Sequence, residues 1–365
     1  MPLVEHADLP TFSRLREQGH LVLSLEQALR QDIRELHIGF LNMMPDGALQ
    51  ATERQFIRLV GNSNRIAQFF VYPFSLPGIQ RGKDAQEHVD RHYFRFEQLQ
   101  RDGLDALIIT GANVENRHLD REPFWEPLVR CVNWARQNVV SVLCSCLATH
   151  ALLKHLHGIE RQPLAQKRWG VYSHRTARNG HPLLHDVNTR FDAPHSRHND
   201  ISRVALEEAG LTVLSESIHG EVHMAISPDQ ARVLYFQGHP EYDINSLLKE
   251  YKREVLRFAA GELAAPPPFP ENYFNPKAQR IAQRYVDMVG RRRASRAREN
   301  TSRLAEEEFP ARELESELDN TWGDTAKVIV NNWLGLVYQL THPDRTKQFM
   351  SHINPDDPLQ LRRRG

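Results

Sequence analysis

The sequence has few cysteines and no long apolar run. Three cysteines among 365 residues cannot form the disulfide framework that supports many small secreted domains. No run of about 18 apolar residues suggests a membrane span, and the N-terminus lacks the charged and then apolar segment of a secretory leader. We therefore expect a cytoplasmic protein without a membrane partner.

The sequence also lacks net charge. Its 46 basic residues balance its 46 acidic residues, so nothing draws the whole chain toward nucleic acid or an anionic membrane. We accordingly expect no nucleic-acid partner. A length of 365 residues allows one large domain or two moderate ones, with ample chain for a core.

From Ile33 onward, short apolar runs alternate with segments of helical spacing. This alternation predicts an α/β fold with a doubly wound, mostly parallel sheet flanked by helices. Ligands bind such sheets at the carboxyl ends of the strands. We expect strands at residues 36–41, 66–72 and 106–110, another ending near residue 145, and helices at 51–59 and 125–137.

Composition divides the chain into four segments. We expect an N-terminal extension at 1–32, a catalytic α/β domain at 33–263, a proline-rich spacer with a charged insertion at 264–320, and a C-terminal segment at 321–365 that packs back on the core. The charged stretch 279–318 carries an arginine block and a glutamate block, which predicts a solvated helical insertion.

Cys146 is the candidate nucleophile. It stands where the apolar run Val139-Val140-Ser141-Val142-Leu143 gives way to a helical pattern. A strand-to-helix turn exposes a side chain at the top of a sheet, and the helix N-terminus favours a thiolate. Cys144 and Cys131 are interpreted as core residues. A zinc site of Cys144, Cys146 and His150 is disfavoured, because no second ligand pair has suitable spacing.

A second apolar run ends at Gly238-His239-Pro240-Glu241, which supplies a base and a carboxylate. His239 would accept the thiol proton, and Glu241 would orient the imidazole, as in catalytic triads on unrelated folds. The backbone amides of Ala112, which follows Gly111, and of Leu147 are the expected oxyanion hole.

With these residues assembled, the sequence resembles the homoserine O-succinyltransferase family, an O-acyltransferase branch of the class I glutamine amidotransferase-like fold. The matching motifs are spread over most of the chain. They are Leu41-Asn42-Met43-Met44-Pro45, Ile109-Thr110-Gly111-Ala112, Gly170-Val171-Tyr172, Pro194-His195-Ser196-Arg197, Gly238-His239-Pro240-Glu241-Tyr242-Asp243 and Asn332-Trp333-Leu334.

The resemblance implies a role in methionine biosynthesis and assigns Cys146, His239 and Glu241 to the catalytic triad. It also implies three substrate contacts, by Lys167, Ser196 and Arg253. The implied reaction is a ping-pong transfer from acyl-CoA to L-homoserine through a cysteine thioester, with no cofactor and no metal. A homodimer is an option that the sequence leaves open.

The sequence departs from the family pattern at several positions. The usual Ile-Cys-Trp-Gly-Ala-Gln around the nucleophile is Ser145-Cys146-Leu147-Ala148-Thr149-His150, and the role of His150 is open. Glu115 falls on the position that discriminates acyl donors, where a carboxylate resembles the acetyl-specific members and would repel a succinyl carboxylate. Arg117 or His118 would supply a compensating cation, and we predict succinyl-CoA, with acetyl-CoA as the alternative.

Two functions are alternatives to acyl transfer. A glutamine amidotransferase or cysteine hydrolase would use the same triad without acyl-CoA. A phosphate or nucleic-acid binder would act through the arginines at 291–298, and its binding would depend strongly on salt.

Overall fold

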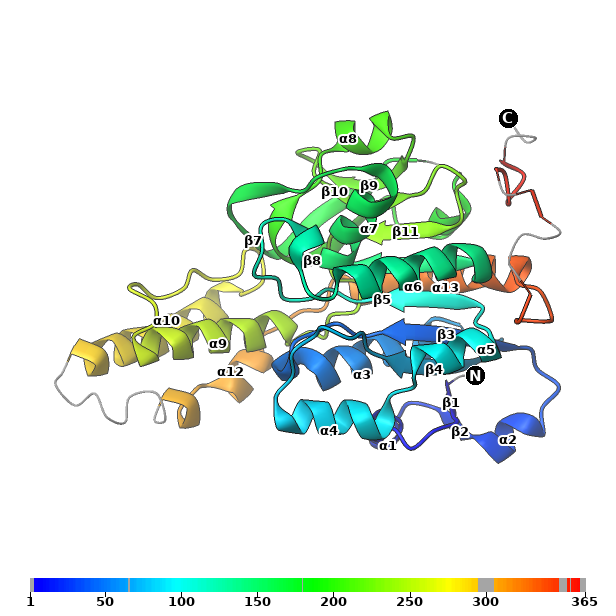
Figure 1. Ribbon diagram of the computed structural model, residues 1–365. Coiled ribbons are helices and arrows are strands. Elements are labelled where there is room, and N and C mark those ends of the chain that lie inside the picture. Colours follow the sequence, from blue (N-terminus) through cyan, green and yellow to red (C-terminus); the bar gives the residue numbers. More distant parts are fainter. Residues whose placement is uncertain are drawn as a thin grey trace.

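The computed structural model describes residues 3–64, 66–178, 180–294, 305–347, 353–354 and 356–361. In this part of the chain, eleven strands form one sheet in the order β2-β1-β4-β3-β5-β6-β11-β10-β9-β7-β8 (Figure 1). The strands are β1 (Leu3–Glu5), β2 (Val22–Ser24), β3 (Glu35–Leu41), β4 (Gln68–Phe74), β5 (Ala106–Ile109), β6 (Ser141–Ser145), β7 (Gln162–Thr176), β8 (Arg190–Asp200), β9 (Thr212–Ser217), β10 (Val222–Ile226) and β11 (Val233–Phe236).

The sheet has a parallel and an antiparallel part. Neighbouring strands from β2 to β11 pair in parallel, whereas the pairs from β11 through β10, β9 and β7 to β8 are antiparallel. Strands β5, β6 and β11 are adjacent and parallel, so their carboxyl ends meet at one edge. The predicted doubly wound, mostly parallel sheet is confirmed.

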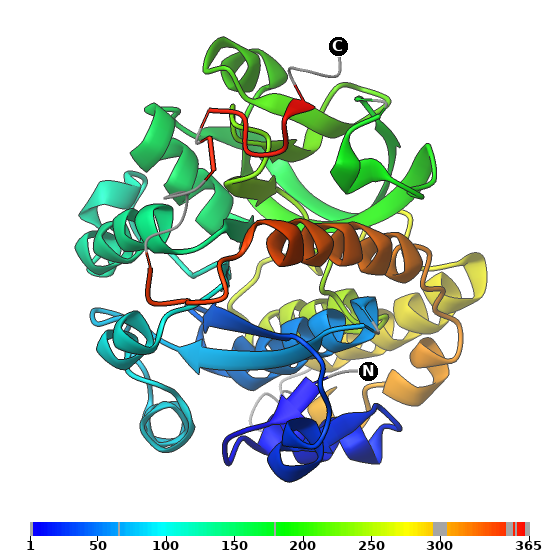
Figure 2. The same ribbon diagram turned by 90° about the vertical axis from the view of Figure 1, so that its right-hand side faces the viewer.

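Helices cover both faces of the parallel part. The apolar sides of α1 (Pro10–Glu17), α3 (Asp46–Ser63) and α13 (Gly323–Leu340) share one core, and those of α5 (Phe96–Asp102), α6 (Trp125–Asn138) and α7 (Leu147–His157) share the other. Figure 2 shows α13, coloured orange-red, crossing the middle of the molecule. Trp333 of α13 is fully buried and donates a hydrogen bond to Ser141 Oγ over 2.9 Å, so α13 packs on the sheet.

The remaining helices are shorter or lie at the edges of the molecule. They are α2 (Leu25–Leu29), α4 (Lys83–His92), α8 (Arg203–Glu208), α9 (Ser246–Ala260), α10 (Pro276–Ala294) and α12 (Ala311–Glu315). Among the described residues, no helix is both long enough and apolar enough to cross a bilayer.

The expected strand at 66–72 is displaced in the structure, where β4 begins at Gln68. The side-chain oxygen of Asn64 accepts hydrogen bonds from the amides of Ile66 and Ala67, at 2.7 and 3.2 Å. This local turn occupies the backbone amides of Ile66 and Ala67, which strand pairing would need as hydrogen-bond donors. It also leaves the Ile66 side chain exposed. A side chain that bonds to nearby backbone therefore sets the strand boundary.

Two expectations about the edges of the chain change. Strands β1 and β2 of the expected N-terminal extension join the sheet, and the side chains of this segment enter the same core as α3.

The charged insertion is helical, but the prediction that it is simply solvated is wrong. One face of α10 buries Ile281, Tyr285 and Val289 in a cluster with α9 (Figure 1), because apolar residues recur at helical spacing within the charged stretch. Of the arginines at 291–298, Arg296 and Arg298 lie outside the described residues.

Candidate active site

Cys146 lies in a sharp turn between β6 and α7. Its backbone angles are φ 55° and ψ −115°, in a region that residues with a β-carbon rarely adopt. The Cys146 amide donates to the Phe236 carbonyl of β11 over 2.8 Å, which helps to hold the turn. The side chain stays partly accessible, whereas Cys144 is fully buried. Such an elbow presents a nucleophile at the N-terminus of a helix, as the sequence predicts for this residue.

His239 and Glu241 follow β11, the neighbour of β6. The Nδ1 atom of His239 pairs with Glu241 Oε1 over 2.8 Å, and both side chains are buried. The His239 amide donates to the Pro194 carbonyl over 2.9 Å, and the Tyr242 ring stacks on the imidazole with centroids 4.2 Å apart. The His239 imidazole is therefore held in position, with Nε2 left for other partners.

Burial alone would lower the pKa of His239, but the pKa is raised well above the usual 6.5 because the Cys146 sulfur and Glu241 favour the imidazolium. The Nε2 atom has no well-aligned hydrogen-bond partner among the described residues. Catalytic hydrogen bonds often tighten only when substrate binds. The arrangement can therefore hold a thiolate beside an imidazolium.

The loop after β5 lies against the nucleophile. A β-carbon on Gly111 would lie 3.5 Å from Cys146 Cβ and 3.6 Å from the Leu147 nitrogen. The backbone after Gly111 is thus close to the first amide of α7. This proximity is what an oxyanion hole of the Ala112 and Leu147 amides requires, and that role stays a prediction.

Lys167 and Ser196 meet at a carboxylate that the sequence reasoning missed. Glu250 of α9 accepts hydrogen bonds from Lys167 Nζ at 3.1 Å, Ser196 Oγ at 2.6 Å and Tyr242 OH at 2.8 Å. Burial would raise the pKa of Glu250, but the pKa is lowered by Lys167, Ser196 and Tyr242, which favour the carboxylate. The only sequence signal for Glu250 is its position three residues before Arg253, on the same face of a helix.

Two other predicted site residues lie at the surface. Arg253 is one helical turn beyond Glu250, its side chain is 62% exposed, and its Nε contacts Glu254 at 3.2 Å. The structure does not bring it into contact with Lys167 or Ser196. Glu115 is also exposed, and its amide donates to Glu122 Oε1 over 3.0 Å. The roles of Arg253 and Glu115 stay predictions.

The other two cysteines and His150 are internal. Cys131 and Cys144 are fully buried, and burial raises the pKa of the Cys144 thiol to about 12, so both fit the predicted core role. The Nε2 atom of His150 pairs with Gln237 Oε1 over 3.1 Å rather than with a sulfur. The zinc site of Cys144, Cys146 and His150 gains no support from these contacts.

The buried histidines predict a stability that falls in mild acid. Burial lowers the pKa of His37 and of His150 to about 3, against 6.5 in an unfolded chain. Below pH 6.5 the unfolded state binds more protons, so each group removes up to about 1.4 kcal/mol of unfolding free energy per pH unit, and none of this loss is present well above pH 6.5. Urea unfolding between pH 7.5 and 5.5 measures the slope.

The matched variants are His150→Gln, which is expected to have a shallower slope, and the exposed His219→Gln, which is expected to keep the wild-type slope. Equal slopes for wild type and His150→Gln would contradict the prediction.

The model of the family described as homoserine O-succinyltransferase matches residues 2–343. A protein named homoserine O-succinyltransferase from Nitrosococcus oceani is 57% identical over 363 residues, with 100% of this chain and 99% of that protein covered. One of the same name from Methylococcus capsulatus is 56% identical, covering 99% of this chain and 100% of that protein.

Among solved structures, a glutamine amido transferase from Methylobacillus flagellatus is similar at 14% identity and a TM-score of 0.42, covering 84% of this chain and 96% of that one. The family match and the full-length relatives agree with the motifs found in the sequence. The chain belongs to the homoserine O-succinyltransferase family.

Proposed function

We propose that the protein is a homoserine O-succinyltransferase of methionine biosynthesis, which transfers the acyl group of succinyl-CoA to the hydroxyl of L-homoserine. The observation that carries the proposal is the meeting of Cys146, His239 and Glu241 at the ends of β6 and β11. Family membership supports the choice of substrates.

In the first half-reaction, His239 accepts the thiol proton and Cys146 attacks the thioester carbonyl of the acyl donor. The Ala112 and Leu147 amides donate hydrogen bonds to the oxyanion of the tetrahedral intermediate. When the intermediate collapses, the carbon–sulfur bond to CoA breaks, and His239 returns the proton to the departing CoA thiolate. The acyl group is then a thioester on Cys146.

In the second half-reaction, L-homoserine enters after CoA has left. His239 removes the hydroxyl proton as the oxygen attacks the acyl-enzyme carbonyl, and Cys146 leaves with the proton that His239 holds. Glu241 stabilises the imidazolium in both halves. A thioester is already activated for acyl transfer, so the proposal needs no cofactor.

Lys167 and Ser196 are the proposed substrate contacts, and Arg253 is the proposed partner of the amino-acid carboxylate. Glu250 holds the first two side chains, because its carboxylate binds both of them. The Lys167 ammonium also lies 4.4 Å from the centroid of the Trp169 ring. These contacts leave the lysine few alternative positions.

Replacing Glu250 with glutamine is expected to raise the KM for homoserine about 10-fold, because losing one charge-assisted pair costs about 1.5 kcal/mol of binding. The rate of acyl-enzyme formation should stay within about 2-fold of wild type. Steady-state kinetics with varied homoserine and stopped-flow release of CoA measure the two quantities. The control is Glu262→Gln, an exposed carboxylate paired with Arg257. An unchanged KM in Glu250→Gln would refute this positioning role.

The choice of succinyl donor is supported by the names of the relatives and by a cation near the acyl site. Arg161 donates to the carbonyls of Asn116 and Arg117 at 3.1 and 3.2 Å, so a guanidinium lies against the loop that contains Glu115. Its charge also interacts with Cys146. A cation there offsets the repulsion between Glu115 and a succinyl carboxylate.

Comparing kcat/KM for succinyl-CoA and acetyl-CoA tests the donor. A ratio above 10 in favour of succinyl-CoA is expected, and a ratio below 1 would make the protein an acetyltransferase. Glutaminase activity without acyl transfer would favour the amidotransferase alternative. The proposal also includes a cytoplasmic location, with a homodimer as one option for assembly.

A further inference from the structure

Three buried histidines that no part of the proposed reaction uses form a cluster beside Gly238. His174 comes from β7, His195 from β8 and His223 from β10, and their side chains are at most 2% exposed. The ring centroids lie 5.1 Å apart for His174 and His195, 4.9 Å for His174 and His223, and 5.3 Å for His195 and His223. The three rings form a nearly equilateral triangle.

One nitrogen on each ring has no hydrogen-bond partner among the described residues. These atoms are His174 Nε2, His195 Nε2 and His223 Nδ1. The three residues can each offer a ring nitrogen such that the three nitrogens lie within 4.8 Å of one another. A buried polar atom without a partner costs about 1–3 kcal/mol. An ion bound among the three rings would satisfy these atoms together.

Two of these nitrogens converge on the space beside Gly238, the residue before the catalytic His239. A β-carbon on Gly238 would lie 2.8 Å from His223 Nδ1 and 2.9 Å from His195 Nε2. Only glycine leaves this space free, although its φ does not require one. These two ring nitrogens therefore lie beside the backbone that carries the proposed base, His239.

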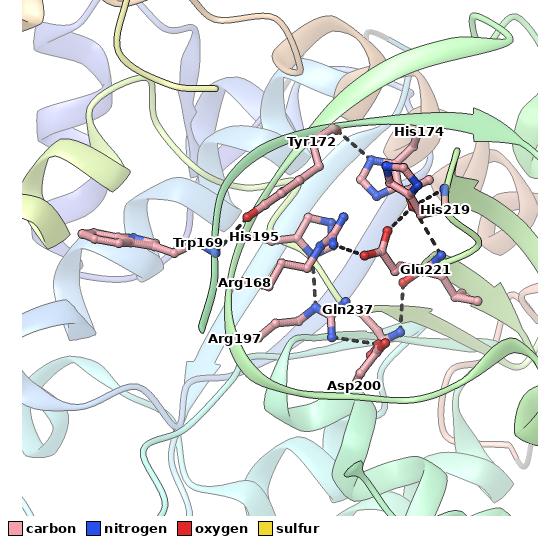
Figure 3. Close-up of polar contacts among 12 residues, drawn as sticks. Arg168, Trp169, Tyr172, His174, His195, Arg197, Asp200, His219, Glu221 and Gln237 are labelled. Carbon is pink, nitrogen blue, oxygen red and sulfur yellow. Dashed lines mark hydrogen bonds and ion pairs between the residues drawn. The ribbon is translucent and has the colours of Figure 1, made fainter. Parts of the chain in front are cut away.

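The surroundings of the cluster suit neutral imidazole ligands. His174 Nδ1 donates to the Tyr172 carbonyl over 2.8 Å, which leaves a lone pair on Nε2 (Figure 3). Such outer hydrogen bonds commonly orient histidine ligands. Burial lowers the pKa of His174 to about 4 and that of His195 and His223 well below 6.5, so the rings are neutral at pH 7.

The charged groups facing the cluster largely neutralise one another. Arg168 pairs with Glu221, and Arg197 Nη1 contacts Asp200 Oδ1 at 2.8 Å (Figure 3). His239, the residue after Gly238, pairs with Glu241. A cation in the cluster is therefore not opposed by an uncompensated arginine.

One contact must change when an ion binds. Arg197 Nε donates to His195 Nδ1 over 3.2 Å, which places the ring proton on Nε2. Ligation through Nε2 requires this proton to move to Nδ1, and the Arg197 Nε–H must then turn away from that atom.

We propose that His174, His195 and His223 form a binding site for a divalent transition-metal ion of the zinc class, which ties β7, β8 and β10 together beside Gly238. Three imidazoles suit zinc, cobalt or nickel rather than magnesium or calcium. With zinc–nitrogen bonds of about 2.1 Å, tetrahedral ligands lie about 3.4 Å apart. The rings must therefore close by about 1 Å around the ion. Its role is structural, because it contacts none of the reacting groups.

The test uses the full chain with Cys146→Ala, so that a thiolate at the active site cannot bind the ion. The protein is produced in cobalt-supplemented medium, because the buried ligands are accessible during folding, and is then dialysed against a weak chelator. Elemental analysis gives cobalt per chain, and visible absorption reports the ligand field. His174→Gln and His223→Gln are made in the same background. His150→Gln is the matched control, because it removes a buried histidine outside the cluster.

About one cobalt per chain is expected in Cys146→Ala and in the His150→Gln control, with tetrahedral d–d bands and no sulfur charge-transfer band. The cluster variants should retain at least 10-fold less cobalt. Less than 0.1 cobalt per chain in folded Cys146→Ala protein would overturn the proposal, as would full retention in both cluster variants. If those variants do not fold, the cobalt content and the absorption spectrum of Cys146→Ala alone decide whether the metal site exists. Neither outcome depends on acyl transfer.

Discussion

Replacing Cys146 with alanine is expected to lower the rate of homoserine acylation by at least about 10⁴-fold. Nucleophilic catalysis divides one difficult transfer into two easier steps, and alanine leaves no atom that can carry the acyl group. The residual rate would come from binding and the oxyanion hole alone. Coupled assays of CoA release and homoserine consumption measure the loss.

The fold should survive this substitution. Cys146 is only partly buried, so its thiol contributes little to the packing of the core. Alanine also tolerates the turn no worse than cysteine, since both have a β-carbon at φ 55°. Cys131→Ala is the comparison, because it removes a thiol that is fully buried in α6. That variant is expected to lose stability but keep its specific activity, and a loss of activity confined to Cys131→Ala would refute the assignment of Cys146.

Glu241→Gln is expected to lower kcat by about 10³- to 10⁴-fold. Its carboxylate accepts a hydrogen bond from His239 Nδ1 at 2.8 Å and favours the imidazolium in a buried site. Glutamine keeps the size but removes the charge, so the proton-carrying form of His239 loses its main stabilisation apart from the thiolate. The pKa of His239 should fall, and with it the population of the thiolate–imidazolium pair at neutral pH.

Two measurements separate this electrostatic role from a structural one. The rate of Cys146 alkylation by iodoacetamide reports the thiolate directly. It should fall with the acyl-transfer rate in Glu241→Gln, while the circular dichroism spectrum stays that of wild type. A variant that alkylates and turns over at the wild-type rate would show that the carboxylate neither orients His239 nor stabilises its charge.

The elements that place the triad follow from local patterns in the sequence. The apolar run that ends before Cys146 folds as β6, and the run that ends before His239 folds as β11. Because parallel strands align their carboxyl ends, two such runs are enough to predict that the thiol and the imidazole meet. The positive φ of Cys146 is the part that sequence alone does not specify, because only the pairing of β6 with β11 defines the turn.

The residues that the sequence reasoning missed depend on non-local contacts. Glu250 reaches Lys167 across 83 positions of chain and Ser196 across 54. The three histidines of the cluster come from three strands of the antiparallel part of the sheet. The sequence patterns at 160–230 had not predicted these strands in detail. No spacing along one element signals such groups, since each belongs to a different strand or helix. The buried face of α10 was missed because its charged residues outnumber the apolar residues that recur at helical spacing.

Intact-protein mass spectrometry of the acyl-enzyme tests the central claim most directly. Wild-type protein mixed with succinyl-CoA should gain the mass of one succinyl group, Cys146→Ala should gain none, and L-homoserine should discharge the wild-type adduct. Peptide mapping should place the adduct on Cys146. Turnover of homoserine without any succinyl adduct, or an adduct that persists in Cys146→Ala, would contradict a thioester on this residue.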